Sequence, residues 1–209
     1  MTRQLFLLGG MSALDAFTPP WLKVCGERVA VLSYALSEKH AALYRDLWAG
    51  RQVEFVAPDE ESGTLDLDLD WAAAAIAGAS AIFVAGGDTS RYHDLYGTGP
   101  LRELICTRYR SGVPYAGVSA GALLALEQCL IPGQDSGVPD RFGPGLGLLP
   151  GTLLGVHFAE WGGAATLHRH LRARHMATGW GLDDCVTLHF RDEAEPVSYG
   201  GSAFLIRLS

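Results

Sequence analysis

Residues 117–121 read Gly-Val-Ser-Ala-Gly, a spacing that can present a nucleophilic hydroxyl. An apolar stretch, 113–116, precedes them and a helix-forming run, 122–127, follows. A serine in a tight strand-to-helix turn needs very small side chains two positions before and after it, because the turn crowds its neighbours. Gly117 and Gly121 meet that need, and a helix N-terminus favours developing negative charge. The pattern therefore predicts a nucleophile elbow with Ser119 as the nucleophile of an acyl-transfer reaction.

A serine hydroxyl needs a base within hydrogen-bond distance, and imidazole has a suitable pKa. His157 is the best placed of the seven histidines, because it directly follows a predicted strand at 152–156. Ligands collect at the carboxyl ends of strands in an open α/β sheet. We expect the other candidates to be surface groups, since His40, His168, His170 and His175 fall on predicted helix surfaces. The spacing of His168 and His170 puts them on different helix faces, which argues against a metal site.

The base in turn needs an acceptor for its second nitrogen. Asp184 lies at the start of a predicted strand and gives the chain order Ser, His, acid, whereas Asp135, in the glycine-rich loop at 133–150, gives Ser, Asp, His. Asp183 and Asp140 are weaker alternatives in the same two segments. Chain order and strand-end placement favour Asp184, with Asp135 left open.

An oxyanion intermediate also needs hydrogen-bond donors. The N–H of Ala120 directly follows the candidate nucleophile, and a glycine N–H of Gly86-Gly87, most directly that of Gly87, is the candidate second donor. Glycine permits close backbone approach at that point.

The elements that must hold these residues alternate between short apolar runs and helical patterns, which is typical of βαβ units around a largely parallel sheet. We predict a three-layer, doubly wound α/β fold in one domain covering residues 1–209. The predicted strands are 4–8, 28–32, 53–57, 80–85, the stretch before Ser119, 152–156 and 185–190, with a hairpin in 195–207 around Gly200-Gly201. The predicted helices are 37–48, 71–77, 90–96, 100–110 and 164–176.

Composition excludes several classes of function. The hydrophobic content is 48%, charged residues make up 19%, and the formal net charge is −7, so the overall field repels nucleic acid and anionic membranes. No apolar run reaches membrane-spanning length or has the form of a signal peptide. The four cysteines form no CxxC pair, which argues against a zinc site and a disulfide framework. We expect a cytoplasmic protein that needs no metal or organic cofactor; monomer and homodimer both stay open.

Five ordered blocks resemble the aspartyl dipeptidase (peptidase E) and cyanophycinase family of serine peptidases. They are Phe83-Val-Ala-Gly-Gly-Asp-Thr-Ser90, Gly112-Val-Pro-Tyr-Ala-Gly-Val-Ser-Ala-Gly-Ala122, Gly145-Leu-Gly-Leu-Leu-Pro150, Val156-His-Phe158 and Gly181-Leu-Asp-Asp184. The resemblance implies a fold like that of class I glutamine amidotransferases, a nucleophile at Ser119, a base at His157 and oxyanion donors around Gly87 and Ala120. Family members commonly carry a glutamate at the place of Asp184, and some carry an aspartate near the place of Asp135.

Substrate preference is where this chain departs from part of that family. Cyanophycinase-like members follow the His-Phe pair with closely spaced arginines, whereas this chain has Ala159-Glu160-Trp161. The resemblance therefore favours hydrolysis of short peptides, foremost dipeptides with N-terminal aspartate held by a local arginine. A cyanophycinase-like β-aspartyl peptidase, a carboxylesterase with His189 as its late histidine, and a non-catalytic binding protein are the alternatives.

Overall fold

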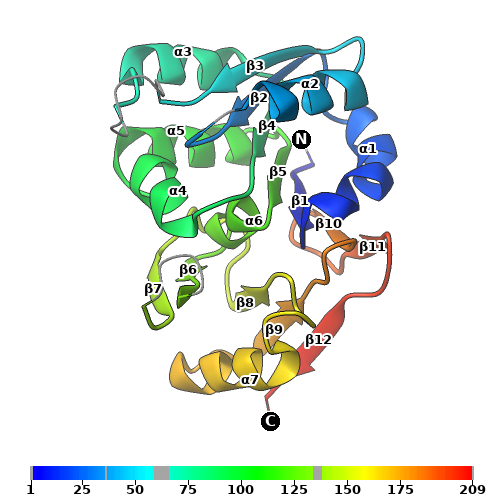
Figure 1. The fold of residues 1–209 in the computed structure, drawn as a ribbon, viewed down its shortest axis with the longest axis vertical. Helices are drawn as coiled ribbons and strands as arrows, with labels where there is room; N and C mark the ends of the chain where they lie inside the picture. Colours follow the sequence, from blue (N-terminus) through cyan, green and yellow to red (C-terminus); the bar gives the residue numbers. More distant parts are fainter. Residues whose placement is uncertain (1, 36, 59–65, 134–137, 209) are drawn as a thin grey trace.

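A seven-stranded sheet forms the centre of the computed structural model, which describes residues 2–35, 37–58, 66–133 and 138–208 (Figure 1). The strand order is β11-β10-β1-β5-β4-β2-β3. The five strands from β1 to β3 in that order run parallel, and β10 and β11 add antiparallel strands at one edge. The strands are β1 (Gln4–Leu8), β2 (Arg28–Leu32), β3 (Gln52–Val56), β4 (Ala81–Val84), β5 (Tyr115–Val118), β10 (Thr187–Arg191) and β11 (Val197–Tyr199).

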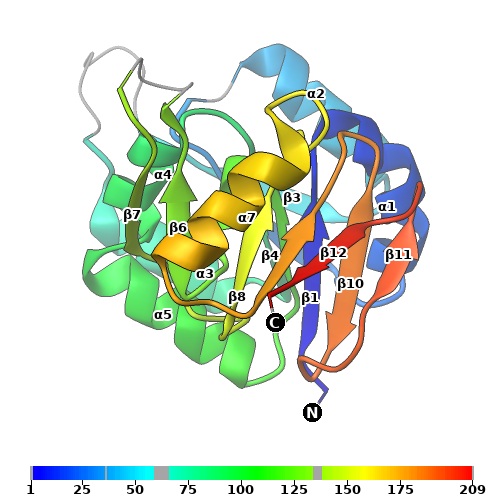
Figure 2. The same cartoon turned by 90° about the horizontal axis from the view of Figure 1, so that it is seen from below.

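Continuous apolar runs form the inner strands because helices cover both faces of the sheet. Figure 2 shows α4 and α5 on one side of the sheet and α1 and α2 on the other. All four residues of β4 and of β5 are buried, as this arrangement requires. The helices are α1 (Leu14–Leu22), α2 (Glu38–Leu47), α3 (Leu69–Gly78), α4 (Thr89–Tyr96), α5 (Gly99–Arg110), α6 (Ala120–Leu124) and α7 (Gly163–Ala173), with a short 3-10 turn η1 (Met11–Ala13). The predicted α/β class with a mainly parallel sheet is confirmed.

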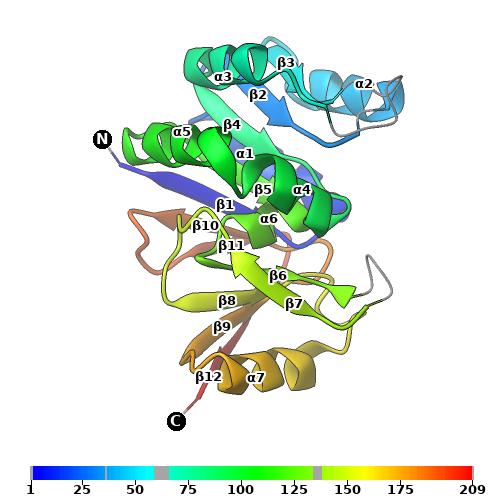
Figure 3. The ribbon, with the colours of Figure 1, turned by 90° about the vertical axis from the view of Figure 1, so that its left-hand side faces the viewer.

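A smaller sheet carries the segment that contains His157. It has the order β12-β9-β8, from β8 (Thr152–Gly155), β9 (Thr178–Gly181) and β12 (Phe204–Arg207). Figure 3 shows this sheet at one end of the molecule with α7 packed on it. A two-stranded ribbon of β6 (Gln128–Ile131) and β7 (Arg141–Pro144) lies beside it. The main sheet therefore carries Ser119, and the smaller sheet carries His157.

The predicted hairpin around Gly200-Gly201 is wrong. The antiparallel pair is β10 with β11. The chain leaves the main sheet after β11, and β12 pairs with β9 in the smaller sheet. Gly200 has φ 75°, and a Cβ there would lie 2.1 Å from the carbonyl oxygen of Cys185. Glycine at this position therefore allows the chain to cross closely over the 182–186 segment between the two sheets. The local sequence pattern of such a crossing is the same as that of a hairpin turn.

Three helices differ from the sequence prediction. The helix-forming run at 122–127 is helical only as far as Leu124, and Leu126 already forms a β-bridge with Leu149. Helix α1 was not predicted, because Pro19 and Pro20 lie inside it and proline disfavours helix interiors. Its buried Phe17 and Trp21 pack on Phe6 at ring-centroid distances of 5.4 and 5.7 Å, so tertiary packing overrides the local preference. Helix α7 ends before Met176 because the chain turns into the left-handed region at φ 54° one residue earlier.

Candidate active site

Ser119 sits in a sharp turn between β5 and α6. Its backbone has φ 51° and ψ −108°, a conformation that is strained for any residue except glycine. A Cβ at Gly117 would lie 2.2 Å from the carbonyl oxygen of Gly121, and a Cβ at Gly121 would lie 2.3 Å from that of Val84. Both glycines are therefore required for the close packing of β4, β5 and α6. The Ser119 N–H donates to the Leu8 carbonyl at the end of β1, which fixes the turn to the sheet.

His157 meets Ser119 from the smaller sheet. The Oγ of Ser119 lies 3.0 Å from Nε2 of His157, a hydrogen-bond distance. His157 follows β8 and has φ 44°. The Leu182 N–H donates to the Gly155 carbonyl, and the Phe158 N–H donates to the Leu182 carbonyl, so two bonds to one residue hold the bend around His157. The Trp161 ring packs against the imidazole with centroids 4.5 Å apart.

Asp184 completes a chain of contacts on the other side of the imidazole. Its Oδ1 lies 2.9 Å from Nδ1 of His157, and its Oδ2 accepts a hydrogen bond from the Ser12 N–H at 3.2 Å. Burial would raise the pKa of Asp184, but the bonds from Ser12 and the neighbouring imidazole outweigh it and lower that pKa below its usual value. The carboxylate is therefore ionised at neutral pH and able to stabilise an imidazolium.

Gly10 makes room for this carboxylate. A Cβ at Gly10 would lie 1.6 Å from Oδ1 of Asp184 and 3.0 Å from Cε1 of His157. Gly9-Gly10 is visible in the sequence as the end of the first strand, but nothing local indicates that the Gly10 backbone contacts residues about 150 to 170 positions later. Gly10 and Ser12 are the supporting residues that sequence reasoning missed.

The other candidate carboxylates do not contact His157 or fall outside the described residues. Asp135 lies outside them. Asp183 accepts a hydrogen bond from the Ala159 N–H at 2.9 Å, which braces the segment after His157. Asp140 accepts from the Gly133 N–H at 2.8 Å and lies 2.9 Å from Nε2 of His170. The shorter reach of aspartate relative to glutamate does not prevent the contact between Asp184 and His157.

The two candidate oxyanion donors come from the residue after Ser119 and from the β4–α4 loop. The N–H of Ala120 is in the first turn of α6, where backbone N–H groups have no intrahelical acceptor. A Cβ on Gly86 would lie 3.5 Å from Cβ of Ser119, so the β4–α4 loop is adjacent to the hydroxyl. Gly87 has φ 139°, and a Cβ there would lie 2.6 Å from the Tyr34 ring. Only glycine fits this position without strain.

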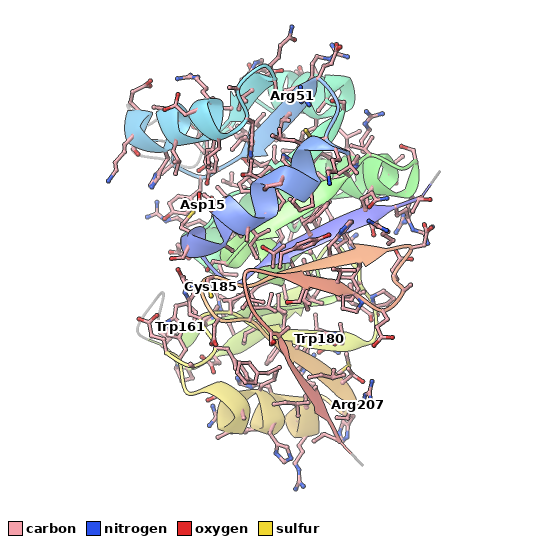
Figure 4. The ribbon with its side chains drawn as sticks, turned by 90° about the vertical axis from the view of Figure 1, so that its right-hand side faces the viewer. Asp15, Arg51, Trp161, Trp180, Cys185 and Arg207 are labelled. Carbon is pink, nitrogen blue, oxygen red and sulfur yellow. The ribbon has the colours of Figure 1, made fainter. Side chains whose placement is uncertain are left out.

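A cavity of about 320 Å³ opens in front of Ser119. Trp161 lines this cavity, and Figure 4 shows it on the same side of the molecule as Cys185 and as Asp15 of α1. Apolar and aromatic groups form much of the lining, and among the described residues His40 is its ionisable side chain besides His157 and Tyr44. The lining comprises Met11, Ser33, Ala35, His40, Tyr44, Ala85, Gly86, Gly87, Ser119, His157 and Trp161.

Two of the remaining histidines, His170 and His189, are buried rather than at the surface. The prediction of His170 as a surface residue is wrong, because it is buried and packs edge-on against Phe142 at 5.2 Å while bonded to Asp140. His189, the late histidine of the carboxylesterase alternative, is buried in β10, stacks on Phe6 at 3.8 Å and lies 2.6 Å from Oε1 of Gln4. Its environment is that of a structural side chain in the sheet.

The described residues offer neither a metal site nor a membrane-spanning helix. Within them, no group of three or more His, Cys, Asp or Glu side chains is arranged to hold a metal ion. None of the helices in those same ranges is long and apolar enough to cross a membrane.

A serine, an imidazole and a carboxylate in hydrogen-bonded series at the strand ends of an α/β sheet define the arrangement of serine-type hydrolases. The chain belongs to peptidase family S51, since the sequence model of that family matches residues 67–196. This match covers β4, β5, β8 and the 182–184 segment, and thus all the contacting residues Ser119, His157 and Asp184. The predicted membership of the peptidase E and cyanophycinase family is confirmed.

Two relatives support this assignment. The chain is 29% identical over 114 residues to the uncharacterized peptidase YgaJ of Bacillus subtilis (strain 168), covering 52% of this chain and 46% of that protein. It is 30% identical over 133 residues to a cyanophycinase of Geminocystis herdmanii (strain PCC 6308), covering 61% of this chain and 49% of that protein. The matches thus span about half the length of each relative.

Solved structures support the fold. A peptidase from an acI-B1 Actinobacterium superposes with a TM-score of 0.73 at 17% identity, covering 99% of this chain and 91% of that one. A structure described as a putative peptidase E protein from Listeria monocytogenes EGD-e gives a TM-score of 0.64 at 15% identity, with full coverage of both chains.

Proposed function

We propose that this protein is a serine peptidase that hydrolyses short peptides through an acyl-enzyme on Ser119. The observation that carries the proposal is the contact series from Ser119 Oγ to His157 Nε2 at 3.0 Å and from His157 Nδ1 to Asp184 Oδ1 at 2.9 Å. Each member has the neighbour that its proposed role requires. Membership of peptidase family S51 supports peptide bonds as the target.

The proposed reaction uses each of these groups in turn. His157 accepts the proton of Ser119 as Oγ attacks the peptide carbonyl, and Asp184 stabilises the resulting imidazolium. The N–H groups of Gly87 and Ala120 donate to the developing oxyanion, each contributing roughly 10²–10³ in kcat by comparison with other oxyanion holes. His157 then gives its proton to the leaving amine. A water molecule, deprotonated by the same imidazole, hydrolyses the acyl-enzyme.

For the substrate, we propose dipeptides with N-terminal aspartate as the first class to test. The cavity in front of Ser119 is lined by no lysine or arginine from the described residues, so the expected arginine partner is not among the lining side chains. His40 is the candidate partner instead. Its Nδ1 lies 3.1 Å from the Ser37 hydroxyl, which orients the ring at the start of α2. A single imidazole would be a weaker anchor for a carboxylate than a bidentate arginine, so a modest aspartate preference is expected.

A β-aspartyl peptidase activity is the second candidate, because one of the matched relatives is named a cyanophycinase. Assays of α-linked and β-linked aspartyl dipeptides separate the two proposals. The α-linked preference rests on the absence of closely spaced arginines after Phe158, where this chain has Ala159, Glu160 and Trp161.

The test combines labelling with turnover. Wild-type protein should react with a fluorophosphonate and hydrolyse an aspartyl-anilide, whereas Ser119→Ala should do neither. Ser111→Ala, a substitution at an exposed hydroxyl after α5, is the matched control and should behave as wild type. Equal labelling or equal turnover in Ser119→Ala would refute the assignment. Peptide binding without turnover at any pH would favour a non-catalytic relative, and hydrolysis of esters alone would favour an esterase.

A further inference from the structure

A second cavity, of about 190 Å³, lies next to the one in front of Ser119. Val156 and Phe158, the residues on either side of His157, line it, and Trp161 lines both cavities. Its other walls come from α6, β6 and α7. The two cavities thus share Trp161, the residue that packs against the His157 imidazole. The lining comprises Leu123, Leu130, Pro132, Asp140, Gly155, Val156, Phe158, Trp161, Gly163, Thr166, Leu167, Arg169 and His170.

Two polar side chains of this lining, the buried His170 and the more exposed Asp140, already have partners. His170 and Asp140 are bonded to each other at 2.9 Å, and the second carboxylate oxygen of Asp140 accepts from the Gly133 N–H. The remaining wall is mostly aliphatic and aromatic. An occupant therefore gains by burying apolar surface rather than by satisfying an unpaired buried group.

The path of the proton in the proposed reaction indicates which residue of the substrate would lie at the second cavity. His157 must deliver its proton to the leaving amine, so the leaving residue has to lie on the imidazole side of the reacting carbonyl. Trp161 packs against that imidazole and lines the second cavity as well as the first. The acyl residue of the substrate would then occupy the first cavity, beside Met11 and Tyr44.

The geometry points to the second cavity as the subsite for the side chain of the leaving residue, selecting a single apolar side chain such as leucine. This inference rests on the proposed peptidase function. The volume suits one such side chain, since a cavity of roughly 150 Å³ accommodates benzene. The chain would therefore discriminate among dipeptides by their second residue as well as by their first.

Arg169 adds a charge at the same cavity. Its side chain is 67% exposed and lies 4.0 Å from Oδ2 of Asp140, so it is not held in a tight pair. The leaving residue of a dipeptide carries a free carboxylate, which this guanidinium can bind. Because the contact is solvent-exposed, its effect is small, about threefold in KM.

The experiment compares dipeptides that differ only in the leaving residue, Asp-Leu with Asp-Gly and Ala-Leu with Ala-Gly. For wild type, kcat/KM should be at least about tenfold higher for the leucine member of each pair. Thr166→Phe fills the second cavity from the half-buried surface of α7 and should remove that advantage while changing glycine substrates by less than about twofold. Ala165→Phe adds the same bulk at the neighbouring exposed position and should keep the wild-type ratio. Arg169→Gln should raise KM for Ala-Leu but not for its C-terminal amide.

The outcomes separate the two proposals. Failure of all four dipeptides, with no fluorophosphonate labelling, would overturn the peptidase function and this inference with it. Hydrolysis with equal kcat/KM for leucine and glycine would overturn the subsite alone. A uniform loss for all substrates in Thr166→Phe, with the leucine advantage retained, would likewise overturn it.

Discussion

Gly10→Ala should inactivate the protein without unfolding it. The added Cβ would lie 1.6 Å from Oδ1 of Asp184, and the carboxylate must retreat by about 1.5 to 2 Å to reach ordinary van der Waals contact. A hydrogen bond that measures 2.9 Å is lost at that displacement. Asp184 can move because its side chain is 43% exposed, so the clash is relieved at the far end of a side chain rather than in the backbone.

The expected cost is large for activity and small for stability. Removing the carboxylate of other Ser-His-Asp triads lowers kcat by about 10⁴. We expect kcat/KM to fall by about 10³ to 10⁴, equivalent to about 4 to 5.5 kcal/mol in activation free energy. The free energy of unfolding should change by less than about 1 kcal/mol, because a half-exposed ion pair contributes little. Gly78→Ala is the control, since its nearest new contact would be at 3.9 Å.

A double-mutant cycle tests the stated cause. Kinetics on an aspartyl-anilide and urea unfolding would be measured for Gly10→Ala, Asp184→Ala and the pair. If Gly10→Ala acts only by displacing the carboxylate, it should cost no more than a few-fold in the Asp184→Ala background. Wild-type activity in Gly10→Ala, or a further loss of about 10³ in the double variant, would refute the reasoning.

Three other substitutions have defined outcomes. Gly87→Ala forces a side chain into φ 139° against the Tyr34 ring and should lower kcat by about 10² to 10³, measured in a peptide assay; an unchanged kcat would exclude this loop as an oxyanion donor. Trp161→Ala removes the ring packed on His157 and should lower kcat/KM by about three- to tenfold, consistent with a lost cation–π contact to the imidazolium; a rate equal to wild type would argue against that contact. Burial, and after it the charge of Arg191, lowers the pKa of His189 to about 4. The imidazole therefore takes up a proton at a higher pH in the unfolded chain than in the folded one. The free energy of unfolding should thus fall by roughly 3 kcal/mol as pH drops from about 6.5 to 4. Urea unfolding at pH 7 and 4.5 should show a smaller decline in His189→Phe; an identical decline would contradict the assignment.

Local patterns were sufficient to predict the five parallel strands of the main sheet and the residues at their ends, but not β6, β7 and β9, which the sequence prediction left out. The apolar runs at β1, β2, β4 and β5 are continuous because both faces of the sheet are covered, and such runs are readable without tertiary information. The contact of Ser119 with His157 follows from two strand ends that meet on one side of the molecule. The spacing of Gly117 and Gly121 was informative because the turn leaves no room for a Cβ.

Features that depend on distant contacts could not be predicted in the same way. The bond from Ser12 to Asp184 joins residues 172 positions apart, and the chain near Ser12 has no local signal for it. His170 looks like a surface residue on an amphipathic helix until the neighbouring segment supplies Asp140. Helix α1 forms despite two prolines because its aromatic face packs on β1, an interaction that helix propensity does not contain.

The placement of the contacting residues on two separate sheets has a mechanical consequence. Ser119 moves with the main sheet and His157 with the smaller one, while Asp184 lies in the link from β9 to β10 that connects them. Any slippage between the sheets would open the 3.0 Å contact long before either sheet melts. Heat should thus abolish turnover several degrees below the calorimetric transition, and a crosslink across the boundary between the sheets should bring the two temperatures together.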